Sequence, residues 1–224
     1  METAALQPLS PVFVTRSGRR GLAERLTASA AARTPGVRRL ALALCLLVLA
    51  GCGAERQRAP GISIPRSPGG FQAAAFPAAG VKIDAPRGWG LTRLALPAVF
   101  TSASGDAQLS AFAYRREQPL PTPARLDDAR RELVRLARRR NRSFALLEAS
   151  TTRIGDVPAV AVVGEQTIGR RQVRTLSVHL YRGNVEYVFE GLATLAHFDR
   201  VDREVFGPAI GSVRVTGRIR RPRR

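Results

Sequence analysis

The sequence predicts an α+β fold in which two helices cover an antiparallel sheet arranged as a meander. Between residues 144 and 192, four strand-like segments follow one another and are joined by short glycine-containing turns. Consecutive strands joined by tight turns pair in antiparallel fashion. A stretch with helical periodicity precedes this region, around residues 126–137, and a shorter one follows it, around residues 198–206.

The first strands are expected at residues 81–86, 98–102 and 108–115. In the first of them, Val81 alternates with polar neighbours, and Pro86 and the Gly88-Trp89 turn end the segment. Gly105-Asp106 is a turn signal between the second and the third. We therefore expect the folded domain to begin at Val81.

A long helix is expected next. Thr122 is a suitable N-cap, and Pro123 fits the first helical position. Apolar residues then recur at three- and four-residue spacing: Leu126, Ala129, Leu133, Leu136 and Ala137. Asp127 and Asp128 lie near the start, and arginines follow at the end, so both charges suit the helix dipole.

The meander that follows has four expected strands, at residues 144–154, 158–168, 172–182 and 185–192. Gly183-Asn184 is a two-residue hairpin signal between the last two. This turn pairs Arg182 with Val185. The pairing places four apolar side chains on one face: Val178, Leu180, Tyr187 and Phe189.

The opposite face of this hairpin carries the candidate site: Ser177, His179, Tyr181, Glu186 and Glu190. Both carboxylates lie diagonal to the imidazole, about 7–8 Å away. Such a group acts as an acid–base pair, as a metal site, or only as a solvated or salt-bridged surface. Ser177, His179 and Glu190 have the residue types of a hydrolytic triad, but no G-x-S-x-G elbow is present.

We read this face as a ligand or partner surface and assign no catalytic residue. Phosphate loops, dinucleotide fingerprints and zinc spacings are absent from the sequence, so no metal and no cofactor are expected. His197, at the start of the second helix, is expected to be a surface or capping residue.

The C-terminal part is expected to contain a short helix that Gly207-Pro208 stops, and then a last strand over 210–215. From Gly217 the chain is expected to be disordered. Its arginines form a candidate surface for anionic lipid or wall polymer: Arg218, Arg220, Arg221, Arg223 and Arg224.

A targeting signal precedes the domain. Arg38-Arg39 is followed by eleven apolar residues, Leu40–Ala50, whereas a membrane-spanning helix needs about 20. The last four residues, Leu49-Ala50-Gly51-Cys52, resemble the lipobox of bacterial lipoproteins. The resemblance implies that the Cys52 thiol is acylated and that cleavage leaves Cys52 as the N-terminus.

These features divide the chain into a leader and signal peptide (1–51), a lipid anchor and flexible tether (52–80), an α+β domain (81–216) and a basic tail (217–224). A leader counted from Met1 is long, so we expect translation to start at Val37; a genuine long leader is the alternative. Because Cys45 leaves with the signal, the mature chain has no disulfide.

The charge is strongly positive, with 36 basic and 17 acidic residues. All basic residues except Lys82 are arginines, so a GC-rich genome accounts for part of the excess. The rest favours anionic neighbours. Nucleic acid is not expected as a partner, because binding it requires a cytoplasmic protein and no aromatic residues interleave with the arginines.

Three further features belong together: the Pro86-x-Gly88-Trp89 turn, the long helix before the meander, and the closing segment Phe206…Ile210-x-Ser212. Together they resemble the PsbP-like fold, which a photosystem extrinsic subunit, a Ran-binding nuclear import factor and the LpqN-type bacterial lipoproteins share. The resemblance covers Val81 to Val215. It implies a non-catalytic binding or assembly factor, with no active-site motif to transfer.

The sequence thus predicts an exported protein, lipid-anchored on the extracytoplasmic side of the cell membrane, whose domain binds an envelope protein or an anionic polymer. One alternative is an envelope hydrolase or other enzyme that uses the face of His179, Glu186 and Glu190. A second alternative is a cytoplasmic nucleic-acid-binding protein.

Overall fold

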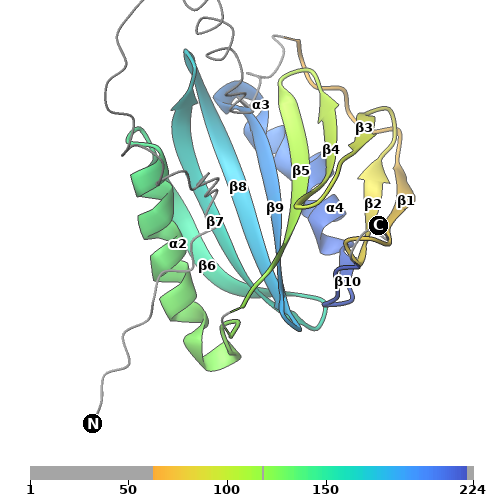
Figure 1. Ribbon diagram of the computed structural model, residues 1–224. Coiled ribbons are helices and arrows are strands. Elements are labelled where there is room, and N and C mark those ends of the chain that lie inside the picture. Colours follow the sequence, from red (N-terminus) through yellow and green to blue (C-terminus); the bar gives the residue numbers. More distant parts are fainter. Residues whose placement is uncertain (1–62, 118, 221–224) are drawn as a thin grey trace, which may run out of the picture. The chain divides into compact units, whose positions relative to one another are not determined.

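The computed structural model describes residues 63–117 and 119–220 (Figure 1). The predicted leader, the start at Val37, the anchor Cys52 and the last three arginines of the tail lie outside the described residues. Within them, a seven-stranded sheet has the order β3-β4-β5-β9-β8-β7-β6, and a three-stranded sheet has the order β1-β2-β10. The strands pair antiparallel throughout both sheets. The predicted α+β class and meander are confirmed.

The strands have the following bounds: β1 Phe71–Phe76, β2 Val81–Pro86, β3 Gly90–Arg93, β4 Ala98–Ser104, β5 Ala107–Arg115, β6 Ala145–Ile154, β7 Val157–Ile168, β8 Arg171–Arg182, β9 Val185–Thr194 and β10 Arg214–Val215. The predicted hairpin register is correct. Arg182 pairs with Val185 and Val178 pairs with Phe189 across β8 and β9. The apolar face of this hairpin is buried, as alternation along two half-covered strands requires.

The helical segments are η2 Pro123–Arg125, α2 Leu126–Arg140, α3 Leu195–Val201, the π-helical η3 Asp202–Phe206 and α4 Gly207–Gly211. Helix α2 packs on β6 and β7, on one face of the large sheet. In Figure 1, α3 and α4 lie behind the sheet, on the opposite face, next to the small sheet. Among the helices described, none is long and apolar enough to cross a membrane.

The main core lies between the large sheet, the α3–α4 helices and the small sheet. Phe206 is fully buried there. It packs on Gly191 of β9, where an added Cβ would meet the phenyl ring at 2.6 Å. A side chain at position 191 would therefore push the helical segment η3, which carries Phe206, away from the sheet. A second, smaller cluster under α2 joins Leu126, Ala129 and Leu133 to Tyr181 and its neighbours.

The predicted tether extends too far into the chain. Residues 71–76 form β1, which pairs along its whole length with β2. Before it, the Ser63 carbonyl accepts from the Asp106 backbone N–H at 2.9 Å, and the Arg66 carbonyl accepts from Trp89 Nε1 at 3.0 Å. The small-residue composition suggested flexibility, but long-range pairing orders this segment.

The C-terminal predictions also need correction. Gly207-Pro208 does not stop the helix, because Pro208 falls in the first turn of α4, where its missing N–H is not needed. The last strand is only Arg214–Val215. Residues 217–220 are ordered: the Arg220 backbone N–H donates to the Ala78 carbonyl at 2.9 Å, and Ile219 packs against the core. Strand β3 was not predicted.

Candidate functional site

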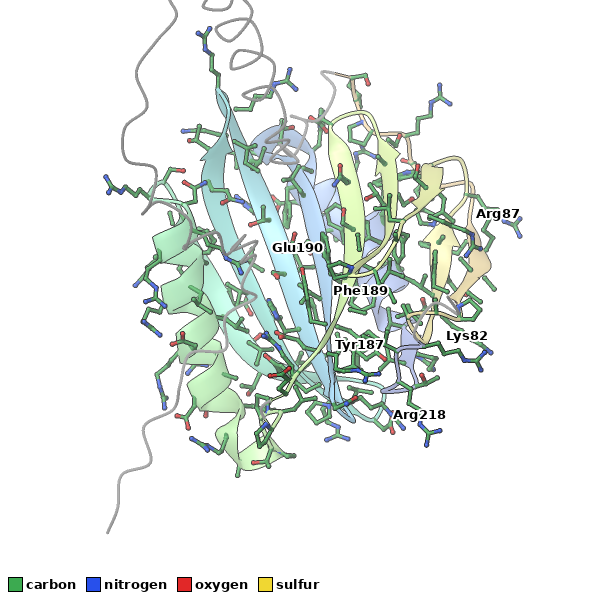
Figure 2. All side chains as sticks on the ribbon, in the orientation of Figure 1. Lys82, Arg87, Tyr187, Phe189, Glu190 and Arg218 are labelled. Carbon is green, nitrogen blue, oxygen red and sulfur yellow. The ribbon has the colours of Figure 1, made fainter. Side chains whose placement is uncertain are left out.

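The predicted face is assembled as the register requires. On β8, His179 pairs with Val188, while Ser177 pairs with Glu190 and Tyr181 with Glu186 on β9. Both glutamates are therefore diagonal neighbours of the imidazole. Glu190 lies on β9 next to the core residue Phe189 (Figure 2).

Three of these side chains and Arg116, which the sequence did not indicate, form a hydrogen-bonded chain. His179 Nδ1 donates to Glu186 Oε1 at 2.7 Å, since a carboxylate only accepts. The other ring nitrogen, Nε2, lies 3.0 Å from Ser177 Oγ. On the far side, Arg116 Nε donates to Glu186 Oε2 at 2.6 Å. The order is Ser177, His179, Glu186 and Arg116, and we call these four residues the His179 chain.

Arg116 is the residue that the sequence analysis missed. It directly follows β5, and its backbone N–H donates to the Asn184 carbonyl at 2.9 Å. This bond fixes the end of β5 at the β8–β9 turn, so the guanidinium reaches Glu186. The pair is separated by 70 residues in sequence. No local pattern links them, and only the pairing of β5 with β9 brings them together.

The chain is buried rather than solvated. His179 is 9% exposed and Glu186 is 1% exposed. Tyr181 is 4% exposed and belongs to the apolar cluster under α2, so it offers no surface to a partner. Ser177 and Glu190 are half-buried. Of the five predicted residues, these two have the side chains that the fold leaves partly open.

The surroundings shift the pKa values of the two glutamates, Glu186 and Glu190, in opposite directions. Burial by itself would raise the pKa of Glu186, but the hydrogen bond and charge of His179, together with Arg116, outweigh burial and lower it. For Glu190, burial raises the pKa, and the opposing charges of His179 and Arg140 do not offset it. The environment therefore favours the carboxylate form of Glu186, whereas Glu190 binds a proton more readily than an ordinary glutamate does.

The Ser177–His179–Glu186 order matches that of nucleophile, base and acid in a hydrolytic triad. The sequence analysis had grouped Ser177 and His179 with Glu190, and the geometry replaces Glu190 by Glu186. An acyl-transfer site also needs backbone donors aimed at an oxyanion. Strand β8 lies between β7 and β9, so the backbone around Ser177 pairs on both sides. We find no such donors on β8.

The second histidine lies in a separate cluster. His197 Nδ1 is 2.9 Å from Asp106 Oδ2, and Thr194 Oγ donates to the same oxygen. Asp106 is 3% exposed. His197 was expected to be a surface or capping residue; it instead ties the start of α3 to the β4–β5 turn. Among the residues that the structure describes, no three His, Cys, Asp or Glu side chains group closely enough to hold a metal ion.

The structure describes two of the five arginines that were predicted to bind an anionic surface. Arg218 and Arg220 are described and exposed, while Cys52, Arg221, Arg223 and Arg224 lie outside the described residues. Arg218 and Arg220 line a groove beside the small sheet.

No protein-family model matches the chain, and no curated protein matches it in sequence. Solved structures resemble it. The solution structure of cyanobacterial PsbP (CyanoP) from Synechocystis sp. PCC 6803 has a TM-score of 0.52 at 14% identity, covering 70% of this chain and 96% of that one. The crystal structure of LpqN, involved in cell envelope biogenesis of Mycobacterium tuberculosis, has a TM-score of 0.50 at 9% identity, covering 65% and 90%. At such identities the likeness shows the fold alone, and that fold is a PsbP-like α+β fold.

Proposed function

We propose that this protein is exported, anchored by lipid on Cys52 to the extracytoplasmic side of the cell membrane, and acts there as a non-catalytic binding or assembly module. The observation that carries the proposal is the Leu49-Ala50-Gly51-Cys52 segment at the end of an eleven-residue apolar run behind Arg38-Arg39. The first described residue, Ser63, follows Cys52 by eleven positions, so little chain separates the anchor from the domain.

Two observations support binding over catalysis. In the His179 chain, Glu186 is paired with Arg116, and the backbone around Ser177 is paired on both sides, so it has no donors free for an oxyanion. The domain also shares its fold with LpqN, which is described as involved in cell envelope biogenesis. An envelope role for this chain fits both the fold and the signal.

The anchor is tested by fatty-acid labelling in a bacterial host. The wild-type chain should incorporate label and appear in the membrane fraction, and Cys52→Ala should lose both the label and the lipoprotein-type processing. Cys45→Ala is the matched control, since Cys45 lies in the apolar run and should not matter. Label that persists in Cys52→Ala contradicts the proposal, and an unprocessed soluble chain beginning at Met1 favours the nucleic-acid alternative.

Hydrolysis is the second candidate, because the Ser177–His179–Glu186 order is that of a triad. A fluorophosphonate probe, which labels activated serines, distinguishes the two functions. We expect no label on Ser177 in the purified chain. Labelling that disappears in Ser177→Ala and in His179→Ala would assign the protein to the hydrolases instead.

A further inference from the structure

A basic groove of about 640 Å³ opens beside the small sheet. Its floor includes Val81 and Val215, whose side chains are buried. Four cations line it: Lys82 from β2, Arg214 from β10, and Arg218 and Arg220 from the segment after β10. Lys82 and Arg218 point outward at the same end of the molecule (Figure 2). The volume is in the range of small-ligand sites, about 300–1,000 Å³.

The wall of the groove that carries the arginines is fixed by the fold. The Thr216 backbone N–H donates to the Gly80 carbonyl at 2.9 Å, and the Gly217 N–H donates to the Tyr187 hydroxyl at 3.1 Å. Gly80 has φ +68°, and a Cβ there would meet Thr216 Oγ1 at 2.2 Å. Only glycine permits this close approach. Arg218 and Arg220 are therefore held beside the sheet before any ligand arrives.

The cations repel one another. Lys82 and Arg214 are directly opposite in the antiparallel pair of β2 and β10, and both are exposed. Like charges at such positions are destabilising. In the described residues, none of the four groove cations makes an ion pair with an acid. A bound anion would remove this repulsion.

Several other arginines of the domain form ion pairs with acidic side chains. On α2, Arg130, Arg131 and Arg135 each pair with an acid three positions before them. On β8, Arg174 pairs with both Glu165 and Asp199. In the described part of the chain, exposed arginines such as Arg138 and Arg142 also make no ion pair with an acid, so the groove is distinguished by the four cations that line one depression.

The position of the groove favours an occupant away from the lipid. Ser63, where the described chain begins, is bonded to Asp106, and Asp106 contacts Thr194 at the end of β9. Gly217 lies against Gly183, at the other end of the same strand. The ten residues of β9 span roughly 30 Å at about 3.3 Å per residue. The groove is therefore at the opposite end of the domain from Ser63, the first residue that the structure describes.

We propose that this groove binds the phosphodiester groups of an anionic polymer of the cell envelope. Guanidinium groups match phosphate oxygens in a bidentate manner. Each phosphodiester has two terminal oxygens and one negative charge, and successive phosphates along a polymer present these charges to the cations of both walls of the groove. The inference rests on the proposed function, since export is what brings the groove to such a polymer.

The test uses the full chain in nanodiscs of phosphatidylcholine and a synthetic poly(glycerol phosphate) as the probe. We expect Lys82→Gln with Arg214→Gln to weaken binding by about tenfold or more. The slope of log affinity against log salt should become shallower by about 1.4, or 0.7 per cation. The control pair, Arg138→Gln with Arg142→Gln, removes the same charge from exposed positions near the end of α2 and should change affinity by less than about twofold.

Three results would overturn the inference. The first is absence of polymer binding by the wild-type chain, and the second is equal weakening in both variant pairs, which would mean a response to net charge alone. The third is loss of polymer binding when phosphatidylglycerol is added to the discs, because lipid headgroups would then occupy the groove. Labelling of Cys52 is scored separately on the same preparation, so failure of the anchor and failure of polymer binding are distinguished.

Discussion

The His179 chain and the basic groove differ in whether their charged side chains have partners of opposite charge. Glu186 is 1% exposed and is bonded to both His179 and Arg116. In the groove, Lys82 and Arg214 are exposed, lie opposite each other and make no ion pair with an acid in the described part of the chain. The charges of the first region are compensated within the fold, whereas no acid of the described residues pairs with the cations of the second.

This difference separates structural charge from functional charge. A buried ion pair whose groups satisfy one another stabilises one arrangement of the strands, and removing one partner leaves an uncompensated charge. Cations that repel one another do not stabilise the fold through their charges, but their positive potential attracts anionic ligands. The sequence analysis placed the candidate site at the histidine and glutamates, whereas we propose the groove as the binding site.

The largest expected effect comes from breaking the buried pair. Glu186→Ala leaves Arg116 without its carboxylate and removes the acceptor of His179, and loss of one partner of a buried pair costs about 3–5 kcal/mol. Total stability of a domain is typically about 5–15 kcal/mol. Urea unfolding should therefore show a much lower midpoint.

Glu148→Ala is the matched control for this comparison. Glu148 is exposed on β6. Exposed substitutions usually change stability by less than about 0.5 kcal/mol. If the two variants unfold at similar urea concentrations, the His179 chain does not hold β5, β8 and β9 together, and the contrast between the two regions fails.

A smaller effect, of opposite sign, is expected at Glu190. Its pKa is raised by burial, so the folded state holds the proton more tightly than the unfolded state does. Stability therefore falls as the pH rises from the unfolded pKa, about 4.3, through the folded pKa. Glu190→Gln removes this loss, so thermal unfolding at about pH 7 should shift upward.

The same substitution should gain little at about pH 4, where the carboxyl is protonated in both states. Glu186 has the reverse dependence: because its pKa is lowered, its contribution is present above the unfolded pKa and is lost as the pH falls through the folded pKa. A Glu190→Gln variant that is less stable at neutral pH would show that this carboxylate is needed in its charged form.

The smallest effect is expected in the groove. Lys82→Gln removes the like charge opposite Arg214, and a cross-strand pair of this kind contributes about 0.2–1 kcal/mol. The variant should be slightly more stable than the wild type in low salt, and the gain should shrink as salt screens the repulsion. A clear loss of stability would indicate that Lys82 has a structural partner.

Local patterns were enough to predict the meander. Alternation along β8 and β9 with the two-residue Gly183-Asn184 turn determined which side chains share a face, and the observed pairing of Val178 with Phe189 agrees. Tight turns set register locally, without reference to the remainder of the fold. The diagonal placement of His179 between the two glutamates followed from the same turn.

Features that depend on distant contacts were missed. Arg116 meets Glu186 across 70 residues, and Asp106 meets His197 across 91. Residues 71–76 were assigned to the tether because the stretch around them, 53–80, is rich in proline, glycine, alanine and serine, and residues 217–220 were assigned to a disordered tail. Both segments are ordered by pairing with strands and by contacts with the core. The composition of a segment indicates whether it can fold by itself, but it does not show which distant part of the chain the segment will pair with.

Thermal unfolding with and without poly(glycerol phosphate) tests the contrast most directly. At about 100 times the dissociation constant, a ligand that binds only the folded state stabilises it by about 2.7 kcal/mol, or roughly 5–10 °C for a domain of this size. Glu186→Gln should unfold at a lower temperature than the wild type and keep the full shift. Lys82→Gln with Arg214→Gln should unfold at the wild-type midpoint or slightly above it and lose the shift. The account is contradicted if the groove variant still shifts, or if the Glu186 variant keeps its midpoint and loses the response.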